Sequence, residues 1–294
     1  MVILSFAACA HSPADDAAED SSPPDSEGRT TLDGVEPVWG ASEVEAGITA
    51  ALGSGLGEPV SLRNWFVGLL DHYVDQPGPD QAVCASVLVQ AHDEETVVSN
   101  WYGSCEANDG TLVDGGWILT ESWGTRAGGE TWQMALLTTI EARDAVGNES
   151  SCGGTAQAVV TRDGEDVEFE LSLGGDYDLA MDRGFLAHPV GAGFFLSGAR
   201  AGGQIEATLD GGLRHDQLSL YFEEVVTAPD VCDGFSGRVR VRDPSSAWLD
   251  WDLDCSTCGP LSFQEQDLGE VCAGEALAEA LRASVSIVAA VEPW

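Results

Sequence analysis

The cysteines are the residues of this chain whose spacing bears most directly on chemistry. Four of them lie near the C-terminus, two in a Cys-x-x-Cys motif: Cys232, Cys255, Cys258 and Cys272. Such thiols form disulfides, hold zinc or take part in redox exchange. Structural zinc sites usually contribute two close pairs, and a redox Cys-x-x-Cys usually opens a helix. Here two cysteines stand alone and the motif is followed by Gly-Pro, so we expect disulfides, with zinc and redox exchange as alternatives.

The predicted pairing follows the strands that carry the cysteines. Cys84 begins one expected strand and Cys105 follows the next, so a hairpin would join them in a disulfide. In the C-terminal group we predict the pairs Cys232–Cys258 and Cys255–Cys272, one of several connectivities that four cysteines allow. Cys152 is left over, and could be buried, free or bridged to another chain.

A second set of candidate ligands follows a Gly-Gly pair and consists of Asp176, Asp178 and Asp182. This spacing is similar to that of a calcium loop. An EF-hand, however, needs oxygen ligands at positions 1, 3 and 5 and a glutamate at position 12. Position 5 here is Ala180, and the flanks are not helical. The three aspartates are a candidate metal site, with a solvated loop as the alternative.

No spacing in the sequence indicates a catalytic site. The five histidines show no H-E-x-x-H spacing, and G-x-S-x-G does not occur. Catalytic carboxylates leave no fixed spacing, so a secreted hydrolase whose carboxylates meet only in the fold remains an alternative. We therefore predict no catalytic residue, no cofactor-binding residue and no cofactor.

The charge balance limits the partners. The chain of 294 residues has 50 acidic and 12 basic residues, with a net charge of -38. Such a surface repels phosphate backbones, so nucleic acid is excluded as an expected partner. The hydrophobic content of 44% is sufficient for a core, and no run has the roughly 18 apolar residues of a membrane-spanning helix.

The N-terminus indicates export. The stretch Phe6-Ala7-Ala8-Cys9 resembles a bacterial lipobox, in which the cysteine is lipidated and becomes the new N-terminus. Eight residues without Lys or Arg precede Cys9, which is short for a signal peptide, and a start codon assigned too far downstream would explain this. Ala10 is not the aspartate that retains many lipoproteins at the inner membrane, which favours the outer membrane. We divide the chain into a signal remnant (1–9), a disordered acidic tether (10–37) and a β-rich domain (38–294).

The elements of the domain follow from periodicity. A helix is expected from a capping box at Ser42 and Glu45 to about Leu52, a second from Ser61 to Pro77, and a last one over 275–290. Between them lie twelve predicted strands: 83–91, 96–102, 117–123, 131–143, 154–162, 166–173, 193–198, 204–209, 218–226, 235–242, 247–254 and 259–265. Glycine-containing turns separate several of them, including 174–176 and 210–212. The fold class is mainly β, with antiparallel sheets in a sandwich or a large curled sheet, flanked by short N-terminal helices and a C-terminal helix.

One hairpin is predicted at residue level from its charges. Arginines at 238, 240 and 242 alternate with valines, and aspartates at 250, 252 and 254 alternate with Trp251 and Leu253. Pairing about Ser246 sets Arg242 opposite Asp250 and Arg240 opposite Asp252. A slip by one residue would set Arg against Trp, so the pattern fixes which face is buried.

Two segments resemble uncharacterised acidic, cysteine-containing lipoproteins of Gram-negative bacteria. They are Cys255-Ser-Thr-Cys258-Gly259 with the following Leu268-Gly-Glu-Val-Cys272, and Gly103-Ser-Cys105 with Asp109-Gly-Thr111. The resemblance implies an envelope address but carries no functional residue.

We therefore expect a lipid-anchored cell-envelope protein, an outer-membrane lipoprotein on the periplasmic or surface face, with a non-enzymatic binding or scaffolding role. Its membrane contact is the lipid anchor on Cys9, and a protein or carbohydrate partner is left open. The alternatives are the hydrolase and a calcium-dependent binding module.

Overall fold

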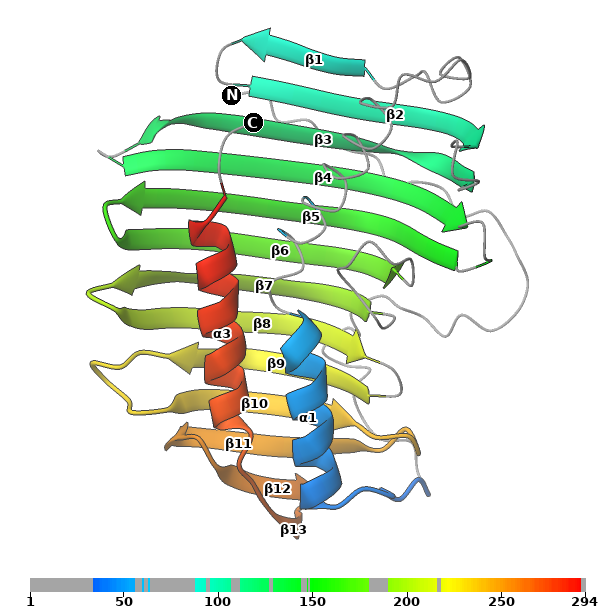
Figure 1. Ribbon diagram of the computed structural model, residues 1–294. Coiled ribbons are helices and arrows are strands. Elements are labelled where there is room, and N and C mark those ends of the chain that lie inside the picture. The colour runs from blue at the N-terminus through cyan, green and yellow to red at the C-terminus, as the bar shows by residue number, and fades with distance from the viewer. Residues whose placement is uncertain are drawn as a thin grey trace.

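The domain is built on one antiparallel sheet in which every strand pairs with the next along the chain (Figure 1). The computed structural model describes residues 34–55, 60, 63, 88–93, 96–106, 112–126, 129–143, 147, 149–179, 190–215 and 218–291. The strands are β1 (Leu88–Asp93), β2 (Thr96–Glu106), β3 (Leu112–Arg126), β4 (Gly129–Arg143), β5 (Glu149–Asp163), β6 (Asp166–Leu179), β7 (Val190–Ala201), β8 (Gln204–His215), β9 (Leu218–Thr227), β10 (Phe235–Arg242), β11 (Trp248–Ser256), β12 (Gly259–Phe263) and β13 (Gln266–Val271). The helices are α1 (Ala41–Gly55) and α3 (Gly274–Ala289).

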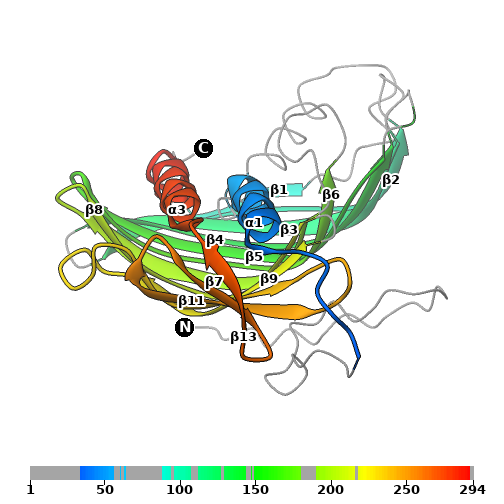
Figure 2. The same cartoon turned by 90° about the horizontal axis from the view of Figure 1, so that it is seen from below.

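The sheet is curved, and both helices pack on its concave side (Figure 2). Strand residues alternate between this face and solvent, as in the buried–intermediate alternation of β11 and β12. The concave side chains form one core with the apolar faces of α1 and α3, including the fully buried Ile48, Leu196, Trp251 and Val285. The burial of this face against the helices is the main force that holds the layers together.

The predicted fold class is confirmed in its curled-sheet form. The strands and the C-terminal helix lie close to the predicted ranges, but most strands are longer than predicted and β13 was not foreseen. Of the second expected helix only Val60, just before it, and Arg63 are described, and both are helical and buried. No helix among the described residues is long and apolar enough to cross a membrane.

Two predicted turns are instead bends within strands. Gly175 (φ +139°) lies inside β6, and Gly211 (φ +104°) lies inside β8. A Cβ on either glycine would overlap a carbonyl oxygen of the neighbouring strand, that of Gly153 or Gly193. The glycines therefore serve close strand approach and curvature, and the chain does not reverse there.

A buried carboxylate fixes the chain before α1. Asp243, 2% exposed in the turn between β10 and β11, accepts backbone hydrogen bonds from Val38 (2.7 Å) and Trp39 (3.3 Å) through Oδ2. Its Oδ1 accepts hydrogen bonds from Ser245 N (2.9 Å), Ser245 Oγ (2.6 Å) and Ala247 N (3.1 Å). One side chain thus shapes the turn and attaches the N-terminal segment to it.

The capping of α1 differs from the predicted Ser42–Glu45 box. Glu43 Oε2 accepts the backbone N–H of Gly40 (3.1 Å) and the hydroxyl of Ser42 (3.1 Å). Hydrogen bonds from its own backbone, then from Ser42 and Gly40, hold the pKa of Glu43 below its ordinary value. Glu45 instead points to the far end of β13, where it binds Cys272 N.

The C-terminus of α3 is capped by a side chain of the sheet. Arg162 of β5 donates from Nη2 to the carbonyl oxygens of Val288 (2.8 Å) and Val291 (2.7 Å). The last turn of α3 contains no basic residue of its own. The guanidinium of Arg162 therefore supplies the positive charge that the carboxyl end of a helix favours.

Candidate functional site

The four C-terminal cysteines form two disulfides at the β10–β13 end of the sheet. Cys232 bonds Cys255, with Cα atoms 5.0 Å apart, and Cys258 bonds Cys272, with Cα atoms 4.0 Å apart. The prediction that all four form disulfides is confirmed. The predicted pairing, Cys232–Cys258 with Cys255–Cys272, is wrong.

The pairing of Cys232 departs from the prediction because this residue lies before β10 begins at Phe235, outside the β10–β11 ladder. The amides of Val231 and Cys232 both donate to Ala228 O, which forms a tight turn. A bulge at Phe235 then shifts the ladder, and Cys255 adopts a positive φ of 52°. Extending the hairpin ladder in a straight line therefore placed Cys232 opposite the wrong residue.

The pairing of Cys258 follows from the unforeseen strand β13. Gly259 pairs with Val271 across β12 and β13, so Cys258 and Cys272 are the next two residues in the same register. The turn of this hairpin uses positive φ at Gln264 (48°) and Glu265 (68°), a conformation typical of tight type I′ hairpins. Neither residue is a glycine or asparagine, and the turn therefore carried no sequence signal.

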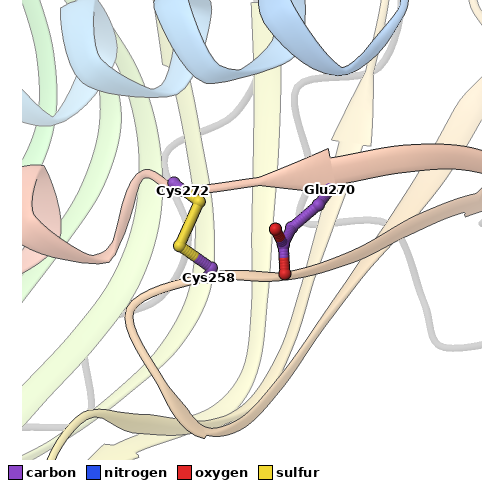
Figure 3. A group of neighbouring side chains, drawn as sticks. All are labelled: Cys258, Glu270 and Cys272. Carbon is purple, nitrogen blue, oxygen red and sulfur yellow. A yellow bond between two sulfur atoms is a disulfide. The ribbon is translucent and has the colours of Figure 1, made fainter.

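A carboxylate lies beside the Cys258–Cys272 disulfide (Figure 3). One ligand atom each from Cys258, Glu270 and Cys272 lie within 4.8 Å of one another. Glu270 and Cys272 are exposed and Cys258 is half-buried, so solvent reaches the group. Sulfurs joined in a disulfide are not thiolate ligands, and the oxidised hairpin is a crosslink with a neighbouring anion.

Three contacts besides the disulfide hold the two strand ends. Cys258 N donates to Ser256 Oγ (3.1 Å), and Cys272 N donates to Glu45 Oε2 of α1 (2.9 Å). Just beyond, Gly274 N donates to Thr257 O (2.9 Å) and connects the start of α3 to the strand end that carries Cys258. The positions of both cysteines thus rest on backbone and α1 contacts as well as on the sulfur bond.

Two of the three candidate metal-binding aspartates lie on a strand. Asp176 and Asp178 belong to β6, where they pair with Gly153 and Ser151 of β5. The loop that the sequence suggested is therefore wrong for these two positions. Their side chains and Asp182 lie outside the described residues, and the metal site itself stays a prediction.

An open groove of about 530 Å³ lies where β3, β4 and β5 bend. It is lined by Asp114, Gly115, Thr139, Ile140, Glu141, Ser151 and Gly153. Register places Asp114 opposite Glu141, Glu141 opposite Ser151, and Ser151 opposite Asp178, so four strands contribute to one cross-strand row. This row could not be read from the sequence, because its members are far apart along the chain.

The predicted arginine–aspartate hairpin exists with its ladder shifted by two residues. Arg240 pairs with Asp250 (Nε–Oδ1 2.9 Å) and Arg238 with Asp252 (2.6 Å), rather than with Asp252 and Asp254. A shift of two keeps the same face, so Val239 and Trp251 remain buried. Arg240 also lies 5.8 Å from the centroid of the Trp248 ring. Because the arginines are paired, these aspartates do not form an open cation site.

One buried ion pair was missed by sequence reasoning. Glu121 of β3 is 1% exposed, and its Oε1 accepts hydrogen bonds from Arg63 Nε (3.0 Å) and Trp132 Nε1 (3.0 Å). A buried carboxylate requires such partners, and here they connect β3, β4 and the helical segment at Arg63. A glutamate at an apolar position of a strand was the available signal.

Cys9 and Cys84 lie outside the described residues. Cys105 lies on β2 and Cys152 on β5, but their side chains are not described. The lipidation site and the Cys84–Cys105 disulfide stay predictions. Comparisons of the chain with protein-family models, curated proteins and solved structures give no match.

Proposed function

We propose that this chain is an exported, lipid-anchored cell-envelope protein whose β-rich domain has a non-enzymatic binding or scaffolding role. The observation that carries the proposal is the pair of disulfides Cys232–Cys255 and Cys258–Cys272. Disulfides form and persist in oxidising compartments, and cytosolic proteins rarely contain them. The lipobox-like sequence ending at Cys9 and the resemblance to acidic Gram-negative lipoproteins support the same address, with the outer membrane as the destination.

The attachment of the N-terminal segment supports a tethered arrangement. Asp243 accepts hydrogen bonds from the backbone N–H groups of Val38 and Trp39. The hydroxyl of Ser245, which lies 2.6 Å from Asp243 Oδ1, also lies 2.8 Å from Glu36 O, so the two acceptors share its one proton. Residues 34–37, the described end of the proposed tether, therefore join the domain at the turn between β10 and β11. A flexible chain as long as residues 10–33 would have a root-mean-square span of roughly 25–30 Å. The anchor then holds the β10–β13 end of the sheet nearer the membrane.

The outward face of the sheet is the surface offered to a partner. The concave face is filled by α1, α3 and the core, whereas the other face carries exposed polar side chains that include Gln133, Gln157, Glu168 and Glu170. With a net charge of -38, contact with a basic or uncharged protein or carbohydrate costs less than contact with an anion.

Metabolic labelling with radioactive palmitate in a Gram-negative host, followed by membrane fractionation, tests the proposal. For this experiment the gene is expressed together with its own upstream region. We expect label on the wild-type chain and its recovery with outer membranes. Cys9→Ser should lose both label and membrane association, whereas the control Cys152→Ser should keep them. An unlabelled wild-type chain recovered in the cytosol with free thiols would refute the proposal.

A further inference from the structure

We propose that Cys258, Glu270 and Cys272 form a zinc site that becomes available when the disulfide between the two cysteines is reduced. Their donor atoms already lie within 4.8 Å of one another, close enough to share one ion. Cysteine thiolates and carboxylates are both zinc ligands, and three protein ligands leave a fourth position of the tetrahedron for water. The exposure of Glu270 and Cys272 leaves room for that water.

The register of the hairpin places the three ligands on one side of it. Glu270 and Cys272 are two residues apart on β13 and its continuation, and residues at this spacing share a face. Cys258 continues the ladder in which Gly259 faces Val271 and Pro260 faces Glu270. The carboxylate of Glu270 lies next to the sulfur pair, between the two strands, as Figure 3 shows.

The strand ends keep their places without the sulfur bond. Ser256 Oγ, Glu45 Oε2 and the Gly274–Thr257 hydrogen bond hold the backbone on both sides. Gly259 lies so close to the backbone of Asp252 that a Cβ would overlap its carbonyl oxygen, which fixes this strand against β11. Reduction therefore leaves two thiols that are already positioned, and zinc binding does not have to order the chain.

The neighbouring carboxylate distinguishes this disulfide from the other one. Each disulfide has one exposed cysteine, Cys272 here and Cys255 in the other, so a reductant in solution reaches both bonds. Among the described residues, only Cys258 and Cys272 have a third potential ligand, Glu270, within reach. A thiolate of an external dithiol attacks the accessible sulfur and forms a mixed disulfide with it. The second thiol of the reagent then displaces the protein sulfur, and the reagent leaves as a cyclic disulfide. Its two electrons and two protons thereby convert the protein disulfide into two thiols. Zinc then displaces the two thiol protons and binds both sulfurs.

Charge favours a cation once the thiols are free. Two thiolates and the Glu270 carboxylate would place three negative charges within 4.8 Å, in a chain of net charge -38. Like charges at this distance repel strongly, and a divalent cation relieves the repulsion. Sulfur ligands select zinc over calcium or magnesium, which prefer oxygen.

Zinc titration of the purified full-length chain, oxidised and after reduction with a phosphine, tests the site. Bound metal is counted by native mass spectrometry, and cobalt serves as a second probe because thiolate–cobalt bonds absorb in the near ultraviolet. We expect the reduced wild type to bind one more zinc ion than the oxidised chain and one more than reduced Cys258→Ser/Cys272→Ser. The double variant Cys232→Ser/Cys255→Ser should retain the site, since neither residue belongs to it.

Glu270→Gln provides the sharper test, with Glu265→Gln in the turn of the same hairpin as control. Removal of a residue that only orients a metal ligand typically weakens metal binding by about 10–100-fold. Loss of Glu270, a direct ligand, should weaken zinc binding by at least that factor. The proposal is overturned if Glu270→Gln binds zinc as tightly as Glu265→Gln, or if Cys232→Ser/Cys255→Ser loses the site. It is equally overturned if Cys258→Ser/Cys272→Ser binds as much zinc as the wild type. Loss of the β-sheet circular dichroism signal on reduction alone would overturn the claim that the thiols stay in place.

Discussion

Substitution of Asp243 by asparagine should detach the N-terminal segment from the sheet. The two carboxylate oxygens together accept five hydrogen bonds, two from the backbone before α1 and three from the turn. Asparagine has one acceptor oxygen. Whichever way its amide is oriented, at least two donors lose their acceptor and face an NH2 group instead.

The structure sets the magnitude of this loss. A hydrogen bond to a charged acceptor contributes about 1.5–3 kcal/mol, and two are lost. Val38 is 67% exposed, so its freed N–H is partly satisfied by water. We therefore expect Asp243→Asn to lower the free energy of unfolding by about 2–4 kcal/mol.

Urea unfolding followed by tryptophan fluorescence, with both disulfides intact, measures this change. Amide hydrogen exchange at Val38 and Trp39 reports the segment directly and should speed up in the variant. The exposed Asp163→Asn removes the same charge at the end of β5 and should alter neither quantity. If Asp243→Asn keeps wild-type stability and wild-type exchange at Val38, the carboxylate does not attach this segment.

Three further predictions concern the helix, the bends and the candidate metal ligands. Arg162→Ala removes two charge-assisted hydrogen bonds to the last carbonyls of α3 and should lower the free energy of unfolding in urea by about 2–3 kcal/mol. Amide hydrogen exchange near Val291 should also become faster, and unchanged exchange there would contradict the capping role. Gly175→Ala meets both a positive φ and the carbonyl of Gly153, so it should lower the melting temperature clearly more than Gly164→Ala, whose strain of about 1–2 kcal/mol comes without a clash. If Asp176, Asp178 and Asp182 bind calcium, isothermal titration should show one site that Asp178→Asn abolishes; absence of binding heat in the wild type would remove this prediction.

The sequence was most informative where one face of a strand is buried. Strict alternation of arginine with valine in β10, and of aspartate with apolar residues in β11, fixed which side chains face the core. It left a shift of two residues undecided, because such a shift preserves both faces. The hydrogen bonds of Asp243 to Ser245 and Ala247 determine the register, because they centre the turn one residue earlier than predicted.

The turns predicted at Gly175 and Gly211 were wrong for a physical reason. Positive φ occurs both in chain reversals and in mid-strand bends, and composition alone does not separate the two. At Gly175 and Gly211 the deciding factor is a carbonyl on the neighbouring strand, which is known only once strands are paired. The cross-strand row through Asp114, Glu141 and Asp178 was invisible for the same reason.

The Cys258–Cys272 pairing depended on β13, the one strand among the described residues that was not predicted. The segment Gln266–Val271 combines two acidic residues with a glycine and shows little alternation, so it resembled a loop. Once it is paired with β12, the Cys258–Cys272 bond follows from register alone. The neighbouring Glu270 then becomes part of a candidate site that no linear motif describes.

Intact mass of the protein extracted from membranes of its native host, with and without reduction, tests the proposed identity most directly. We predict a chain that begins at Cys9 and carries diacylglycerol, and a mass gain on reduction of two hydrogens for each disulfide, including Cys232–Cys255 and Cys258–Cys272. An unlipidated chain that retains the residues before Cys9, with no mass change on reduction, would contradict both the anchor and the oxidising address.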